Sequence, residues 1–141
     1  MIKSLCEVKK MLESHGIEYK AIYLYGSRIY GTDSESSDWD FLVVSNHKFN
    51  FESISFETEE QFLSKLSDHD IKNLEMIFIS EKFKIESDEW KNKIKDWSLD
   101  LSKLRIAISA KASNSWVKAK KKIEVENELY IGLKSLFHAL R

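Results

Sequence analysis

Two apolar, strand-like runs separated by a polar stretch constrain this chain more than any other feature. The first run, EYKAIYLYG at residues 18–26, is rich in aromatic and β-branched residues that alternate along its length. The second run occupies residues 39–44 and follows the polar stretch TDSESSD. Short apolar runs bounded by glycine and polar residues are typical of buried or half-buried strands. We therefore expect two strands here, the first of which ends at a Gly-Ser pair.

Further elements are predicted on both sides of these runs. Residues 3–15 carry apolar side chains at helical spacing, and residues 51–56 alternate like a strand beside the run 39–44. Thr58 and Gln61 have the spacing of a capping box, which predicts a helix through about residue 68. These elements indicate the α+β class, with a small mixed sheet and flanking helices.

The sequence pattern predicts that the second half of the chain is mainly helical. Residues 74–79, LEMIFI, fit either the end of a helix or a short strand, because periodicity cannot decide over so few positions. After a short helix at 91–97, apolar residues trace one face of a long helix over 101–123 and another face over 129–140. We expect a core at residues 1–85 and a helical region at 86–141, packed together as one compact unit.

Charge and cysteine content limit the setting in which the protein works. The formal net charge of −1 gives the whole molecule no bias toward nucleic acid or anionic membrane. A single cysteine, Cys6, cannot form a disulfide framework, and no run approaches the roughly 18 apolar residues that a membrane span needs. The N-terminal pattern does not match a signal peptide. We expect a cytoplasmic protein without a membrane partner.

The stretch between the first two strands carries the residues suited to chemistry. Gly26 and Ser27 offer backbone amides and a hydroxyl to phosphate oxygens, and Arg28 can add a bidentate charged contact. On an extended backbone Asp38 and Asp40 point to the same face, as a Mg²⁺ clamp requires. An isolated Asp-x-Asp is usually a solvated strand end or a helix cap. Here ten residues separate Gly-Ser from Asp-x-Asp, and this combined spacing favours a functional site over those interpretations.

The motifs GSRIYGT at residues 26–32 and SDWD at residues 37–40 resemble the signature of the DNA polymerase β-type nucleotidyltransferase superfamily. The variant is most similar to its phage and bacterial "predicted nucleotidyltransferase" branch. The resemblance implies that Gly26, Ser27, Gly31 and Thr32 hold a nucleoside triphosphate. It also implies three carboxylates that bind two Mg²⁺ ions, with Mn²⁺ as a substitute.

Asp38 and Asp40 would be two of those three carboxylates, and the third normally comes from the next strand. Glu52 in FNFESISF is the first candidate, on a strand face expected to be shared with Ile54 and Phe56. The same glutamate can also be read as an exposed residue of an edge strand. The reserve candidates are Glu57 and Glu75.

The predicted long helix has a basic surface without acidic residues between positions 101 and 123. This surface could bind a triphosphate or a nucleic-acid backbone, with Trp116 as a stacking platform. An equally good interpretation is a solvated helix face with Trp116 in the core. The C-terminal helices also resemble those of the same branch, which implies that certain side chains face the active-site cleft. These are Lys111, Lys118, Lys134, His138 and Arg141. A lone histidine on an apolar stripe is more often a packed residue.

Two functions follow as hypotheses. The first is an enzyme of the EC 2.7.7 type that transfers a nucleoside monophosphate (NMP) from a triphosphate to a hydroxyl of a protein or RNA. The second is a non-catalytic nucleotide-binding or antitoxin-like module that docks a partner protein. The apolar face that still runs at Arg141 indicates a fragment, or a helical partner or oligomer that completes the packing.

Overall fold

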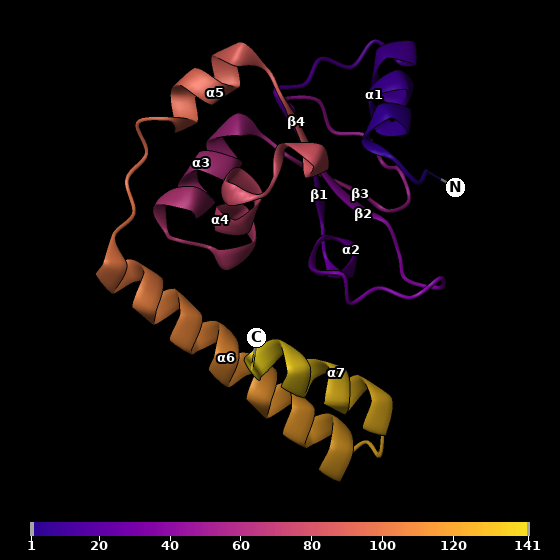
Figure 1. Ribbon diagram of the computed structural model, residues 1–141, viewed down its shortest axis with the longest axis vertical. Helices are drawn as coiled ribbons and strands as arrows, with labels where there is room; N and C mark the ends of the chain where they lie inside the picture. Colours follow the sequence, from indigo (N-terminus) through magenta and orange to yellow (C-terminus); the bar gives the residue numbers. More distant parts are fainter. Residues whose placement is uncertain (1, 141) are drawn as a thin grey trace. The chain divides into compact units, whose positions relative to one another are not determined.

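Figure 1 shows the computed structural model of the protein, which describes residues 2–140. The chain divides into two compact units, Met1–Ser98 and Leu99–Arg141, and each is described by itself. No helix within the described residues is long and apolar enough to cross a membrane.

The first unit is built on a four-stranded mixed sheet. Its order is β3-β2-β1-β4, in which β1 is antiparallel to both β2 and β4, while β2 and β3 are parallel. The strands span Ala21–Tyr25 (β1), Asp40–Val44 (β2), Ile54–Glu57 (β3) and Lys84–Glu86 (β4). The predicted α+β class with a small mixed sheet is confirmed, although β4 was not predicted.

Helix α1, Leu5–Ser14, covers one face of the sheet (Figure 1). It begins where the Ser4 side chain accepts a hydrogen bond from the Glu7 amide at 3.2 Å. Its apolar stripe packs against the strand residues that point to this face. The buried cluster comprises Val8, Leu12, Ile17, Ile22, Leu24, Phe41, Val43 and Ile54.

The opposite face of the sheet is covered by α3, Glu59–Ser67, α4, Ile71–Phe78, and α5, Asp88–Ile94. The capping box at the start of α3 is present in both directions, as predicted. The ambiguous segment LEMIFI resolves as helix, since α4 extends to Phe78. The core on this side consists of Tyr23, Leu42, Phe62, Leu66, Leu74, Met76 and Trp90.

The expected strand at residues 51–56 is wrong in its bounds. Phe51 forms only an isolated bridge with Ile54, and the chain turns at Ser53, whose φ is +66°. The strand therefore begins at Ile54. Glu52 lies in the turn, so it does not share a strand face with Ile54 and Phe56.

The first unit extends past residue 85, where the sequence suggested a boundary. Strand β4 pairs with β1 through residue 86, and α5 places Trp90 fully in the core. A hydrogen-bonded network joins these elements: Tyr23 Oη accepts from Trp90 Nε1 at 2.8 Å and donates to Glu86 Oε2 at 2.6 Å. Glu86 also pairs with Lys84 at 3.3 Å. These contacts make residues 84–94 part of the core unit.

Substituting Tyr23→Phe is expected to lower the free energy of unfolding by about 1–3 kcal/mol, because it leaves the buried Trp90 N–H without an acceptor and removes a hydrogen bond that Glu86 accepts. Burial, followed by the bond to Glu86, raises the pKa of the Tyr23 phenol. The folded state thus holds this proton more tightly than the unfolded state, so the stabilisation is complete below pH ~10 and is lost above it.

Urea unfolding at about pH 9 and pH 11 measures this effect. The wild type should lose more stability than Tyr23→Phe over this interval, whereas Tyr130→Phe, which alters a tyrosine that is 79% exposed, should behave like the wild type. Equal losses in wild type and Tyr23→Phe would contradict the network.

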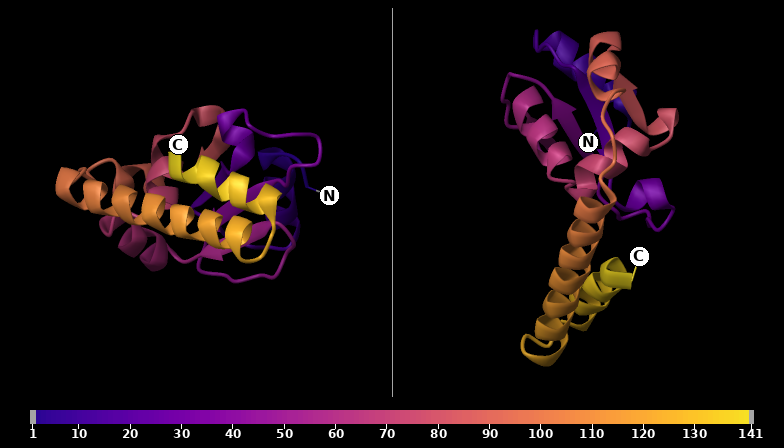
Figure 2. Two further views of the ribbon diagram at one scale, coloured as in Figure 1. Left: turned by 90° about the horizontal axis from the view of Figure 1, so that it is seen from below. Right: turned by 90° about the vertical axis from the view of Figure 1, so that its left-hand side faces the viewer.

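The second unit is a helical hairpin of α6, Leu101–Glu124, and α7, Leu129–Leu140, in which α7 folds back along α6 (Figures 1 and 2). The helices approach closely at Gly132, where a Cβ atom would collide with Ile123. Both long helices were predicted. Many apolar side chains of this unit stay exposed, among them Leu101, Trp116, Val117, Leu129, Tyr130, Leu133 and Phe137.

Candidate functional site

Strand β1 ends in a tight turn that only glycine accommodates well. Gly26 has φ +89° and ψ −159°, a backbone region that is essentially restricted to glycine. A single helical turn follows, α2, Ser27–Tyr30, and it ends at Gly31 in the left-handed conformation with φ +69°. The Thr32 amide donates to Ser27 O at 3.2 Å and closes the turn. The predicted Gly-Ser turn is thus a compact bend between β1 and the following loop.

Asp40 lies directly against this turn. It opens β2 and pairs in register with Tyr25, the last residue of β1. A Cβ atom added to Gly26 would stand 3.1 Å from Asp40 Oδ2. The absence of a side chain at Gly26 therefore gives the Asp40 carboxylate its place beside the turn, and two predicted site residues 14 positions apart come together.

Arg28 holds the loop that connects α2 to β2. Its Nη1 lies 2.9 Å from Asp33 Oδ2, and its Nη2 donates to Ser37 O at 2.6 Å. The guanidinium carbon also stands 4.1 Å from the ring centroid of Trp39, which stacks on Phe41. Because these contacts engage both terminal nitrogens, Arg28 fixes the course of the loop as it approaches Asp38.

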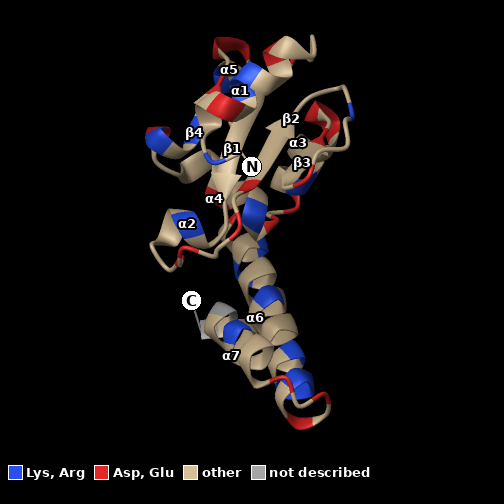
Figure 3. Cartoon of the chain, turned by 90° about the vertical axis from the view of Figure 1, so that its right-hand side faces the viewer, with Lys and Arg blue, Asp and Glu red and all other residues tan. Residues whose placement is uncertain are grey.

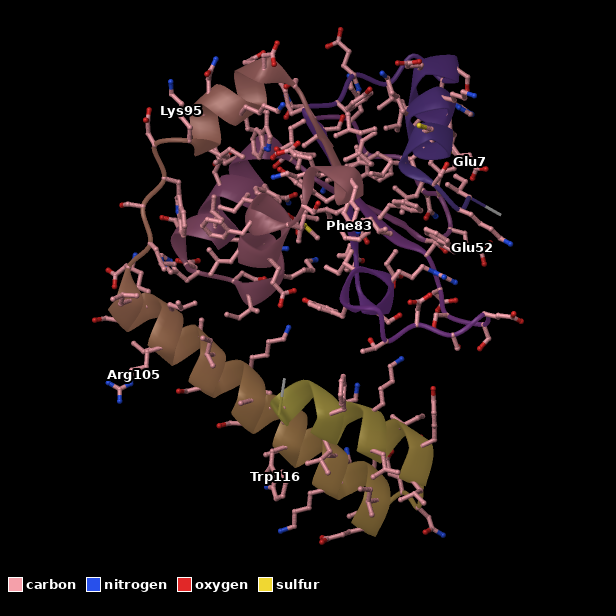
Figure 4. The ribbon with its side chains drawn as sticks, in the orientation of Figure 1. Glu7, Glu52, Phe83, Lys95, Arg105 and Trp116 are labelled. Atoms are coloured by element: carbon pink, nitrogen blue, oxygen red, sulfur yellow. The ribbon has the colours of Figure 1, made fainter. Side chains whose placement is uncertain are left out.

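Asp38 is exposed and lines a cavity of about 550 Å³. Glu52 and Ser53 line the same cavity, together with Arg28 and Trp39. Glu52 lies on the side of the first unit that carries α1 (Figure 4). Asp40 is absent from the lining residues, so the cavity brings Glu52 near Asp38 without including Asp40.

The neighbouring strand does not place a carboxylate beside Asp40. Phe41 pairs with Ile54 in the parallel register, and its amide donates to Ser53 O at 3.0 Å. One residue earlier in each of the two strands' sequences, the residue opposite Asp40 is therefore Ser53. Among the residues that the structure describes, no group of three or more His, Cys, Asp and Glu side chains is placed to hold a metal ion.

The two reserve carboxylates are both hydrogen-bonded to other side chains. Glu57 is buried at the far end of β3, where it pairs with Lys65 at 2.6 Å and accepts from Asn73 Nδ2 at 3.0 Å. Since Glu57 stands beside Val44, the length of β2 separates it from Asp40. Glu75 on α4 accepts a hydrogen bond from Tyr30 Oη on α2.

Comparison with protein families decides the affiliation of this fold and site. A family model described as "Polymerase beta, Nucleotidyltransferase" matches residues 7–95. The chain belongs to this family. No curated protein and no solved structure matches it. The matched range contains most of α1, the whole sheet and the segment from Gly26 to Asp40, so the affiliation rests on the first unit.

The residues of the nucleotidyltransferase domain fit one divalent cation better than two. Mg²⁺ commonly binds one or two protein carboxylates and completes its shell with substrate phosphates and water. Asp40 offers such a hard oxygen beside a turn that is free of side chains at Gly26, and Asp38, two residues earlier, is the second candidate ligand. A second ion would need the third carboxylate, which the described residues do not bring to Asp40.

Residues predicted to approach the site from the second unit stay predictions. Lys111 and Lys118 are exposed on α6, whose basic residues are coloured blue on the ribbon of Figure 3. Trp116 is 57% exposed and projects from α6 (Figure 4), which fits the stacking interpretation better than a core tryptophan. The side chain of His138, like the whole of Arg141, lies outside the described residues.

The contacts that α4 makes near the turn could not be predicted from the sequence. Lys72 Nζ stands 5.4 Å from the ring centroid of Tyr25, and Glu75 binds Tyr30, which lies 45 positions earlier in the chain. From the sequence, Glu75 was predicted only as a reserve candidate for the third metal-binding carboxylate. No periodicity or spacing links residues so far apart, so only the packing of α4 against β1 reveals them.

Proposed function

We propose that the nucleotidyltransferase domain binds a nucleoside triphosphate at the Gly26 turn and transfers its NMP to a hydroxyl acceptor. The observation that carries this proposal is the Asp40 carboxylate held against Gly26 in a domain of this family. The motif GSRIYGT further supports placing the chain in the phage and bacterial branch. The single cysteine is compatible with a reducing cytoplasm.

Asp38 and Asp40 would hold Mg²⁺, or Mn²⁺ in its place. When bound, such an ion neutralises phosphate charge and stabilises the leaving pyrophosphate. The backbone at Gly26 admits a phosphate group closely, and the Ser27 hydroxyl donates to its oxygens. Gly31 and Thr32 close the turn that presents them, while Arg28 fixes the loop and adds positive charge near the phosphates.

The transfer itself forms one bond and breaks one. The acceptor oxygen bonds to the α-phosphorus, the bond from that phosphorus to the bridging oxygen breaks, and pyrophosphate leaves. The proton of the acceptor hydroxyl passes to a carboxylate, for which we propose Glu52, because it lines the same cavity as Asp38. Completing a second metal site would require the turn that carries Glu52 to move toward Asp40.

The acceptor is proposed from the second unit. The exposed basic side chains of α6 and the exposed Trp116 favour an RNA acceptor. The exposed apolar side chains of α7 favour a protein acceptor or a second helical unit. In either case Lys111, Lys118 and His138 are proposed to contribute contacts to the nucleotide.

Incubation with each α-labelled triphosphate, Mg²⁺, and total RNA or cell lysate tests the transfer. Label should appear on one acceptor with wild type and with Asp96→Asn, which changes an exposed aspartate after α5. Asp38→Asn should reduce the label by at least about tenfold, since it removes one proposed metal ligand.

A non-catalytic module that docks a partner is the second candidate. It is favoured by the exposed apolar residues of α7, and by the lack, among the residues that the structure describes, of a group of three carboxylate, histidine or cysteine side chains that could hold a metal ion. Mg²⁺-dependent nucleotide binding without any label transfer would support this module. Transfer that is lost in Asp38→Asn would exclude it.

A further inference from the structure

The face of the sheet that carries Asp40 is the face that α4 covers. Residues directly opposite in an antiparallel pair share a face, so the Asp40 side chain lies on the same side as Tyr25. Tyr23, two positions earlier, stacks on Phe62 of α3 with ring centroids 5.6 Å apart, which identifies this side. Lys72 of α4 reaches over Tyr25. The Asp40 side chain therefore lies on the side of the sheet that α4 covers.

Helix α2 cannot hold its own position, because four residues make a single turn, and isolated turns of helix are unstable. Side chains fasten it on both sides of the sheet. Ile29 packs against the cluster under α1, and Arg28 binds the loop. Tyr30 reaches the other side and donates its hydroxyl hydrogen to Glu75 of α4.

We infer that the Tyr30–Glu75 hydrogen bond positions the Gly26–Ser27 turn for the triphosphate. This inference rests on the proposed function. Tyr30 and Glu75 are both half-buried, and the acceptor is a carboxylate, which makes a stronger hydrogen bond than a neutral acceptor. The bond fixes the last residue of α2 to α4, and α4 packs on β1. The Gly26–Ser27 turn, which joins β1 to α2, therefore keeps one orientation beside Asp40. Glu75 is a positioning residue that acts through Tyr30.

This role differs from that of a third metal ligand. A ligand must contribute a negative oxygen to the cation, whereas a positioning residue must only accept a hydrogen bond. The amide oxygen of glutamine accepts a hydrogen bond but carries no charge, and the methyl group of alanine does neither. Substitutions of Glu75 by these two residues therefore separate the two roles.

The experiment measures the dissociation constant of Mg²⁺-bound α,β-methylene nucleotides, which cannot undergo the transfer, by titration calorimetry. Each of the four ribonucleotide analogues is tested, and the one that the wild type binds most tightly is kept. Tyr30→Phe and Glu75→Ala should each weaken binding about tenfold, the loss expected for one charge-assisted hydrogen bond. Glu75→Gln should bind close to wild type, and the double variant Tyr30→Phe/Glu75→Ala should bind no worse than either single variant.

Tyr23→Phe is the matched control, since it also deletes a hydrogen bond from a tyrosine hydroxyl to a glutamate in the same unit. At a temperature where it stays folded, its dissociation constant should equal that of the wild type. Unchanged binding in Tyr30→Phe, or equal losses in Glu75→Gln and Glu75→Ala, would overturn the positioning role. A wild type that binds none of the four analogues would instead refute the proposed function.

Discussion

Asp40→Asn is expected to lower Mg²⁺-dependent nucleotide affinity and NMP transfer by at least about 100-fold. Loss of a residue that merely supports a metal ligand costs about 10- to 100-fold, and Asp40 is proposed as a ligand itself. Its carboxylate is held in place beside Gly26, whereas Asp38 is exposed in a loop, so Asp40→Asn should be more damaging than Asp38→Asn.

Asparagine has nearly the shape of aspartate, so this variant should fold like the wild type. Calorimetric titration with and without Mg²⁺ and the labelled-transfer assay measure the two losses, and thermal unfolding confirms the fold. Full transfer activity in Asp40→Asn would mean that the ion, or the nucleotide, binds elsewhere.

Gly26→Ala is the second substitution with a large expected effect. A β-carbon would meet Asp40 Oδ2 at 3.1 Å, and the backbone conformation of Gly26 costs any other residue about 1–3 kcal/mol. The carboxylate must move by a few tenths of an ångström, and displacement of a group at an active site can cost about 100-fold. We expect lower stability together with nucleotide binding weakened about 10- to 100-fold.

Gly16→Ala separates strain from the effect on the site. Gly16 also has a positive φ, +67°, but a β-carbon there would meet no atom within 4 Å. This control should lose about 1 kcal/mol of stability and keep the nucleotide affinity of the wild type. If both variants bind nucleotide normally, the contact between Gly26 and Asp40 has no role in binding.

The parts of the site that are close in sequence could be predicted, because local rules determine them. A strand that ends just before Gly26, a turn with two glycines and a second strand that begins within one residue of the predicted start follow from alternation and from the conformational freedom of glycine. The capping box of Thr58 and Gln61 likewise depends only on neighbouring residues.

The features that were predicted wrongly or not at all depend on contacts between residues that are distant in the sequence. Ser53 adopts a positive φ that its residue type does not signal, and this turn removes Glu52 from β3. The strand Lys84–Glu86 has too few residues to show alternation, and only its pairing with β1 defines it. The link from Tyr30 to Glu75 arises from the packing of α4 on β1, which no local pattern encodes.

The claim that the Gly26 turn and Asp40 form the nucleotide site is tested most directly by amide chemical shifts. A ¹⁵N-labelled sample of the full chain is titrated with an α,β-methylene nucleotide in the presence of Mg²⁺. We expect the largest shift changes at Gly26, Ser27 and Asp40, and we expect these changes to disappear when Mg²⁺ is removed. Saturable shift changes confined to α6 and α7, with the amides of residues 26–40 unmoved, would contradict it.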